Sequence, residues 1–211
     1  MTKKLYILVL VAIIFVAGAA NVISLKSSRE QPMTIFAMDS WNDEVLNNSF
    51  LEAHSENIIM GKVIKILPSK WNTPDGKKPI SDDKKPESKE EFYGKQKEYN
   101  IYTDVIIKVD KKIKNESTTA VVTVRTLGGQ VDEGIMIEED EAKFELGENV
   151  LLFLTKEDPF TDNSAGTHYR VTGWKHGKFS ITTDNQAVRH NVPTEHQKIP
   201  LEELLKSIGA Q

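Results

Sequence analysis

The alternating pattern of residues 101–113, IYTDVIIKVDKKI, constrains the fold more than any other feature of the sequence. A period of two residues is typical of an antiparallel strand with one buried face and one solvated face. The turn at residues 114–117 and the run TAVVTVRTL at residues 119–127 predict that a second strand pairs back on the first as a hairpin. One face carries Tyr102, Asp104, Ile106, Lys108 and Asp110, and the other carries Ile101, Thr103, Val105, Ile107, Val109 and Lys111.

Similar signals predict that the rest of the domain is rich in β-structure. Residues 57–67, NIIMGKVIKIL, are dominated by β-branched side chains and contain Gly61, where a strand often bends or bulges. Residues 149–155, NVLLFLT, are apolar on both faces and predict the most buried strand. Further elements are expected as strands at 167–172, 178–182 and 186–189, and as short helices at 50–56, N-capped by Ser49, and at 201–208. These elements predict a mainly β fold, a small antiparallel OB-like barrel, closed or partly closed, with one or two short flanking helices.

The N-terminal segment predicts export from the cytoplasm. Lys3 and Lys4 precede an apolar run at residues 5–20, as in a signal peptide, and small residues that a signal peptidase accepts end at Ala19 and Ala20. The alternative is a transmembrane anchor, because roughly 21 uncharged residues are enough to cross a hydrocarbon core of about 30 Å. In either case we expect the domain to work outside the cytoplasm, secreted or anchored to the membrane by an N-terminal hydrophobic helix.

The predicted organisation has three parts. Residues 1–26 are the signal peptide or anchor, residues 27–48 form a polar stalk, and residues 49–211 form the β-barrel domain. Residues 68–100 are dense in Lys, Asp, Glu and Pro and nearly free of aliphatic side chains, so we expect a mobile loop there.

Charge and cysteine content exclude several classes of function. The chain has 27 basic and 31 acidic residues and a net charge of -4. This balance argues against nucleic acid or an anionic membrane surface as the main partner, because binding to a polyanion needs clustered Lys and Arg. The absence of cysteine excludes disulfides, thiolate zinc sites and a cysteine nucleophile, so the domain depends on its core for stability.

No residue pattern assigns a catalytic or metal site. The five histidines lack the HExxH spacing, although His168 and His176 could share a metal across a hairpin. The acidic run at residues 138–141 lacks the alternating ligands and central glycine of an EF-hand and is expected to be solvated. No serine lies in a G-x-S-x-G elbow. We therefore assign no catalytic residue, metal or cofactor, and a hydrolase with a scattered site remains an alternative.

Large aromatic side chains are the candidate binding residues, because such groups often anchor interfaces when they are exposed. The candidates are Trp71, Phe92 and Tyr93 in the expected loop, and Trp174 in a late turn. Trp174 is also suited to plugging the barrel. A binding module fits these residues, with an envelope protein as the partner, or alternatively a carbohydrate or cell-wall ligand.

One further pattern combines five segments: AHSENIIMGKV at 53–63, IYTDV at 101–105, GG at 128–129, FELGENVLLFL at 144–154 and GKF at 177–179. Together these segments resemble a group of uncharacterised exported bacterial and archaeal proteins. These proteins in turn are similar to the OB-like barrel of the netrin-module and metalloproteinase-inhibitor superfamily. The resemblance spans about residues 49–208 and implies a binding or inhibitory module without catalysis. Animal inhibitors of that superfamily insert a disulfide-tethered N-terminal cysteine at the protease metal, which a chain without cysteine cannot do, and no functional residue carries over.

Overall fold

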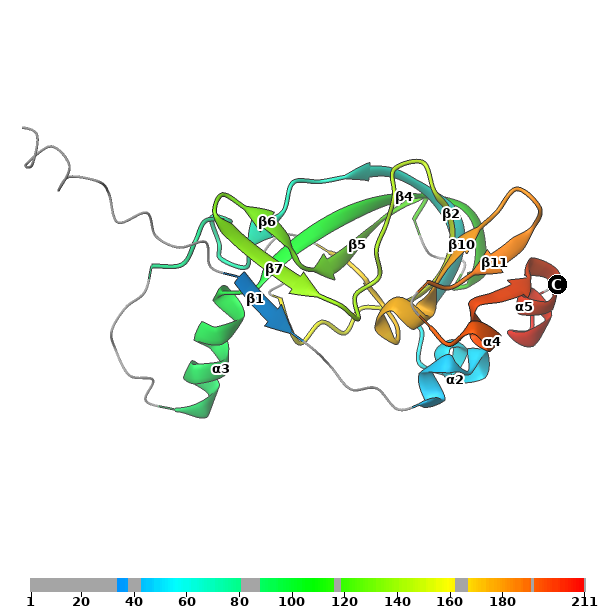
Figure 1. Ribbon diagram of the computed structural model, residues 1–211, viewed down its shortest axis with the longest axis horizontal. Coiled ribbons are helices and arrows are strands. Elements are labelled where there is room, and N and C mark those ends of the chain that lie inside the picture. Colours follow the sequence, from blue (N-terminus) through cyan, green and yellow to red (C-terminus); the bar gives the residue numbers. More distant parts are fainter. Residues whose placement is uncertain are drawn as a thin grey trace, which may run out of the picture. The chain divides into compact units, whose positions relative to one another are not determined.

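Four strands that the sequence predicts belong to the main sheet (Figure 1). They are β2 (Asn57–Ile66), β4 (Ile101–Lys114), β5 (Val121–Leu127) and β8 (Asn149–Thr155). β4 and β5 pair as the expected antiparallel hairpin, and β8 lies antiparallel on the other edge of β2. The structure is a computed structural model that describes residues 34–37, 43–80, 88–115, 119–161, 167–190 and 192–210.

Shorter elements extend this sheet to the order β12-β11-β10-β8-β2-β4-β3, with β5 paired to β4 and β9 paired to β8. Most of them follow the ranges expected from the sequence. The strands are β3 (Lys70–Trp71), β9 (Arg170–Val171), β10 (Lys178–Ile181), β11 (Gln186–Val188) and β12 (Lys198–Pro200). The helices beside them are α2 (Asn48–Ala53), η3 (Trp174–Gly177), α4 (Thr194–Gln197) and α5 (Leu201–Ser207).

The sheet is mainly antiparallel but does not close into the predicted barrel. Within the described ranges, its ladders end at β12 on one side and at β3 and β5 on the other. β5 meets the chain that enters β9 through an isolated parallel bridge between Val124 and Tyr169. Arg125 N donates to Tyr169 O at 2.8 Å, and Tyr169 N donates to Thr123 O at 2.9 Å. β9 itself is two residues long and pairs with β8, so the contact with β5 remains a single bridge.

β8 is buried on both faces, as its sequence predicts, and lies between two cores. Its even-numbered side chains pack between β2, β4 and β5, and its odd-numbered side chains pack under α2 and α5. The first core includes Ile59, Val63, Val105, Ile107, Val122, Val124, Val150, Leu152 and Leu154. The second includes Leu51, Ile58, Leu151, Phe153, Phe179, Ala187 and Leu204. Each fully buried Leu, Ile, Val or Phe side chain stabilises the fold by about 1.5–3 kcal/mol.

The close approach of β2 and β4 explains Gly61. A Cβ at this position would lie 2.3 Å from Lys108 O, and the register of the two strands shifts between Met60 and Gly61. The expected irregularity in the first predicted strand is therefore present.

A second, three-stranded sheet includes a strand from the range expected to be a polar stalk. Its order is β1-β7-β6, with β1 (Thr34–Ala37) parallel to β7 (Gly134–Glu138), and β6 (Gly129–Val131) antiparallel to β7. The 3₁₀ helix η1 (Asp43–Leu46) follows, and Val45 within it is buried. The range 27–48, expected to be a stalk, therefore contains two ordered elements, because backbone pairing and one apolar side chain fix a segment that is polar overall.

The range 68–100, expected to be a mobile loop, also contains structure. β3 pairs with β4 through Trp71 and Ile101, and the Trp71 side chain is 1% exposed. The helix α3 (Lys89–Glu98) begins at Ser88, whose hydroxyl accepts a hydrogen bond from Glu91 N at 3.1 Å. Asn72 holds the two ends of the segment together, since its side chain donates to Lys97 O at 3.1 Å. The composition of the segment does not predict this structure, because one buried tryptophan and a few backbone hydrogen bonds fix it.

The first helix of the predicted domain has a different N-cap from the one expected. Asn47, not Ser49, caps α2, because its side-chain oxygen accepts from Ser49 N at 2.9 Å. The apolar run at residues 5–20, predicted as a signal peptide or anchor, lies outside the described residues. Among the described helices, none has the length and apolar character needed to cross a bilayer.

Candidate functional site

A cleft of about 510 Å³ opens where the end of α2, the segment after β8 and the β9–η3 turn come together. Its walls are largely aromatic, from Phe50, Phe160 and Trp174, and Arg170 lies among them. The remaining lining residues are His54, Thr155, Glu157, Pro159, Val171, Thr172 and Gly173. A concave, mostly apolar surface with a few polar groups is the usual form of a ligand-binding site.

A tight turn places Trp174 in this wall. Gly173 and Trp174 both have left-handed backbone conformations, with φ of 66° and 59°. A Cβ on Gly173 would lie 2.8 Å from Leu51 Cδ2, so the turn packs directly against α2. The Trp174 ring meets Phe160 edge-on with 5.2 Å between ring centroids. Glycine is therefore needed at position 173 for both its conformation and its size.

Arg170 is fixed between aromatic rings and carboxylates. Its guanidinium carbon lies 4.4 Å from the Trp174 ring centroid and 4.7 Å from that of Phe160. Its Nη2 donates to Glu141, and its Nη1 donates to Asp158 Oδ1 at 3.4 Å. The guanidinium therefore packs against two walls of the cleft, and the carboxylates of Glu141 and Asp158 neutralise its charge.

Asp158 is the centre of a buried polar network behind the cleft. Its Oδ2 lies 2.7 Å from His168 Nε2 and accepts a hydrogen bond from Thr161 Oγ1. Its Oδ1 accepts from the backbone N–H groups of Phe160 and Thr161 at 3.0 and 3.1 Å. Burial alone would raise the pKa of this carboxyl, but the bonds from His168 and Thr161 and the charge of Arg170 together hold the pKa well below its usual range.

The network continues through Arg125 into β4 and β5. Arg125 Nη1 donates to Thr161 Oγ1 at 3.2 Å. Its Nε and Nη2 bind the two oxygens of Asp104, at 2.8 and 3.0 Å. Arg125 is 1% exposed, and Asp104 is its direct cross-strand partner. This bidentate pair and the Thr161 bond link the β4–β5 hairpin to the segment after β8.

Glu141 completes the network on the other side. Its Oε1 accepts from Leu127 N at 3.0 Å, at the end of β5, and its carboxylate binds Arg170. The side chain is almost fully buried, and this desolvation raises the pKa of the carboxyl to about 7, although Arg170 and the Leu127 N–H favour the charged form. The polar chain from Asp104 to Glu141 therefore spans the place where β5 meets Tyr169 through a single bridge.

The pair of His168 and Asp158 has the distance of a catalytic base and the carboxylate that orients it. Both side chains are 1% exposed, so a substrate in the cleft does not reach them. We interpret the network as the rigid support of the cleft. Within the described ranges, no group of three or more acidic or histidine side chains is placed to hold a metal.

Trp71 and Trp174, two of the aromatic residues chosen from the sequence, lie in different environments. Trp71 is 1% exposed and Gly134 lies directly against its ring, so it presents no surface to a partner, and its Nε1 has no hydrogen-bond partner among the described atoms. Trp174 is 5% exposed and forms a wall of the cleft. Phe92 and Tyr93 lie in α3, but their side chains are outside the described part of the structure. The proposed contact role of Trp71 is therefore corrected to a core role.

The charged candidates also differ from expectation. His168 binds Asp158, and His176 has its pKa lowered to about 4 by burial and by the nearby charges of Lys175 and Arg189. The acidic run is not uniformly solvated, because Glu138 and Glu141 are 2% and 3% exposed.

Sequence reasoning missed Phe50, Phe160, Arg170 and the network behind them. One signal was available: an arginine inside an apolar strand, as in VVTVRTL, needs a buried carboxylate partner. The partner itself depends on the strand register. Comparison with known protein families, with curated proteins and with solved structures found no match for this chain.

Proposed function

We propose that this chain is a non-catalytic binding module that works outside the cytoplasm and recognises another protein of the cell envelope, as an inhibitor or accessory subunit. The observation that carries this proposal is the aromatic cleft. Its walls are held before any partner binds, because Arg170 is fixed by Glu141, Asp158 and two rings. A preorganised site loses little conformational entropy on association.

The dimensions and chemistry of the cleft favour a protein partner. A volume of about 510 Å³ accommodates one or two apolar side chains of a partner, in a pocket of the kind that forms the centre of protein interfaces. Glu157 lies at the rim, and its carboxylate makes no hydrogen bond or ion pair with the described residues. We expect a partner segment with an apolar or aromatic anchor residue and a basic residue beside it.

The proposed location rests on the N-terminal sequence. Lys3, Lys4 and the apolar run at residues 5–20 support a signal peptide or a transmembrane anchor. A topology reporter fused after Glu30 tests this proposal. Activity restricted to the outside of the cytoplasmic membrane is expected, and a reporter active in the cytoplasm contradicts the location.

The proposed OB-like architecture rests on the strand order. β2 pairs with β4, β4 with β5, β8 with β2 and β9 with β8, and a parallel bridge brings Tyr169 next to β5. A five-stranded, partly open Greek-key barrel has this character, and such barrels commonly act as binding modules.

Site-specific photocrosslinking tests protein binding at the cleft. The full chain, expressed in its source cells, receives a photoreactive amino acid at Glu157, and a control chain receives it at Ile80, which is 94% exposed. We expect one discrete crosslinked protein from the cleft position and none from the control. Phe50→Ala, at the cleft wall, is expected to remove the crosslink, whereas Phe144→Ala, at a half-buried phenylalanine that does not line the cleft, leaves it.

Each other result has a definite meaning. A crosslink to glycan alone favours the carbohydrate or cell-wall alternative, in which sugar rings stack on Phe160 or Trp174. No crosslink that depends on Phe50 overturns the proposal that the cleft binds a protein.

A further inference from the structure

The outer surface of the β2–β4–β5 sheet is basic. Cross-strand pairing places Lys62 opposite Lys108 and Lys108 opposite Val121, while the neighbouring row of Val63, Ile107 and Val122 points into the core. In the next outward row, Lys65 is opposite Ile106. We call this surface the basic face and define it by Lys62, Lys65, Ile106, Lys108, Lys111 and Val121. Lys111 does not keep the simple alternation expected from the sequence, because the register shift between Met60 and Gly61 places it opposite Met60, on the same side of β2 as Lys62.

The lysines of the basic face are poorly compensated. Like charges directly opposite each other destabilise a sheet, yet Lys62 and Lys108 are such a pair. Asp110 lies 4.0 Å from Lys108 and is more than half exposed. Among the described residues, no acidic side chain lies within 4.0 Å of Lys62, Lys65 or Lys111. A protein of net charge -4 therefore carries a concentrated positive region, and the remainder of its surface is correspondingly acidic.

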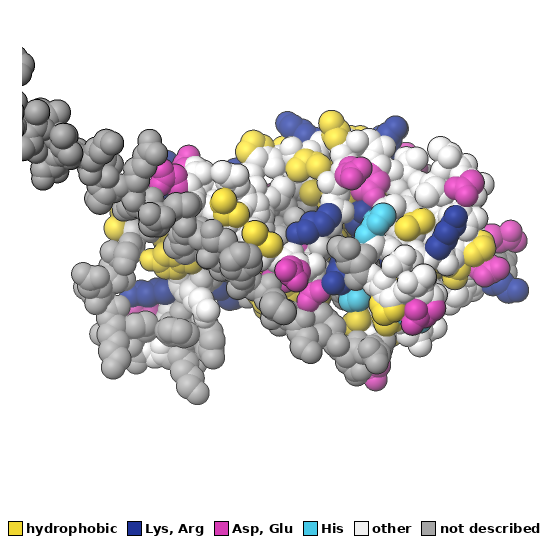
Figure 2. Space-filling model, in the orientation of Figure 1, with side chains coloured by type: hydrophobic (Ala, Val, Ile, Leu, Met, Phe, Trp, Pro, Cys, Tyr) yellow, Lys and Arg dark blue, Asp and Glu magenta, His cyan; other side chains and the backbone are white. Residues whose placement is uncertain are grey.

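Aliphatic side chains are exposed among these lysines. Val121 is 47% exposed, and Ile64, at the bulge of β2 beside Lys65, is 46% exposed. Basic and hydrophobic side chains lie together along the upper edge of Figure 2, over the strand labelled β2 in Figure 1. Long lysine stems with exposed β-branched residues suit the boundary between lipid headgroups and acyl chains.

The composition of the face argues against nucleic acid. Single-stranded nucleic acid is bound through aromatic stacking and arginine. In this region, the nearest such side chains, Tyr102 and Arg125, are 4% and 1% exposed.

We propose that the basic face docks on the anionic headgroups of a lipid bilayer. Lysines near an anionic surface are attracted to it, while the acidic remainder of the domain is repelled, so one orientation is selected. The net charge of the sequence argued against such a surface because it averages over the chain, whereas the strand register collects the lysines on one side of the sheet. The inference is independent of the partner proposed for the cleft.

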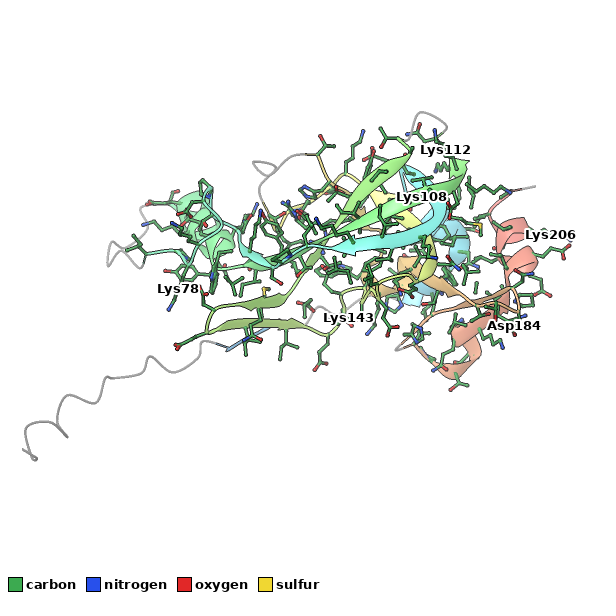
Figure 3. The ribbon with its side chains drawn as sticks, turned by 90° about the horizontal axis from the view of Figure 1, so that it is seen from above. Lys78, Lys108, Lys112, Lys143, Asp184 and Lys206 are labelled. Carbon is green, nitrogen blue, oxygen red and sulfur yellow. The ribbon has the colours of Figure 1, made fainter. Side chains whose placement is uncertain are left out.

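The test uses the full chain and its natural lack of cysteine. Val121→Cys, labelled with a polarity-sensitive fluorophore, reports on the basic face, and Lys206→Cys on α5 reports on a site away from it (Figure 3). Each labelled chain is mixed with vesicles of phosphatidylcholine alone, or with about one third phosphatidylglycerol. The measured quantity is the shielding of each label from aqueous iodide. Total vesicle binding is unsuitable, because insertion of the N-terminal segment into the membrane changes it without changing the exposure of the basic face.

We expect iodide shielding at position 121 with phosphatidylglycerol and not with phosphatidylcholine, and no difference at position 206. Each lysine near an anionic surface changes the docking equilibrium about fivefold, so Lys62→Gln with Lys108→Gln reduces it about 25-fold. Lys77→Gln with Lys206→Gln makes the same charge change away from the face and leaves docking unchanged. High salt is expected to expose the label again, without any substitution.

Equal iodide access at position 121 in both lipids overturns the proposal. Shielding that persists in the Lys62 and Lys108 variant also overturns it. Shielding of position 121 by an acidic protein or glycan, in the absence of anionic lipid, also overturns the proposal. It assigns the basic face to that partner instead.

Discussion

Replacing Glu141 by glutamine is expected to stabilise the fold at neutral and mildly alkaline pH. The carboxyl is 3% exposed, and burial raises its pKa from 4.5 to about 7. The folded protein therefore keeps a proton on Glu141 that the unfolded chain releases. Stability falls as the pH rises from about 4.5 to about 7, and the loss reaches about 3 kcal/mol at about 1.4 kcal/mol per pH unit.

Glutamine does not ionise, and its side-chain oxygen still accepts from Leu127 N and Arg170. The advantage of Glu141→Gln over the natural chain is expected to grow from about 1 kcal/mol near pH 5 to about 3 kcal/mol near pH 8. Urea unfolding, followed by the fluorescence of the buried tryptophans Trp71 and Trp174, measures it.

The comparison between variant and natural chain isolates one group. Protonation of His176 and Asp158, whose pKa values are both lowered, reduces the stability of the fold on acidification. Both groups titrate equally in the two proteins, so their effect cancels in the comparison. Glu139→Gln, at an exposed neighbour in the same acidic run, is the matched control and is expected to show no such pH dependence. An advantage that stays constant with pH, or a Glu141→Gln chain that is less stable near pH 8, refutes the reasoning. The ion pair with Arg170 would then outweigh the cost of burial.

Two further predictions concern stability. Gly173→Ala adds a Cβ 2.8 Å from Leu51 Cδ2 at φ of 66° and is expected to lower the free energy of unfolding by about 1–3 kcal/mol. Gly209→Ala is the control, because Gly209 has a similar φ of 68° but open space around it. A smaller drop in melting temperature for Gly209→Ala separates the effect of the clash from that of backbone strain. Arg125→Met leaves Asp104 without its bidentate partner and is expected to cost about 3–5 kcal/mol in urea unfolding. Adding Asp104→Asn should recover part of that loss, and a double variant no more stable than Arg125→Met contradicts the ion-pair argument.

The elements predicted well are those whose apolar pattern is determined by local burial. β8 has the predicted bounds because all of its central side chains are apolar. α5 ends one residue before its predicted end. β4 followed from its alternation, since Val105 and Ile107 enter the core that β4 shares with β2, β5 and β8. In each case the signal lies within the segment itself.

The elements that were missed depend on contacts between distant segments. β1 is a four-residue segment in a mainly polar stretch, and it becomes a strand by pairing in parallel with β7, about a hundred residues later. Trp71 lies in a highly charged stretch, and its burial against Gly134 is invisible without the fold. The support of the candidate cleft, from Asp104 through Arg125 to Asp158, is likewise set by strand register and loop geometry. Sequence can show that a buried arginine needs a partner, but not which carboxylate supplies it.

β8 separates two hydrophobic cores while contributing side chains to both. Loss of this strand exposes the sheet interior and the surface under α2 and α5 in the same event, so neither core has a partly unfolded state in which it survives alone. The slowest-exchanging amides of β2, β8 and β10 should therefore share one opening free energy, equal to that of global unfolding. A single strand makes the two layers one cooperative unit, without a disulfide between them.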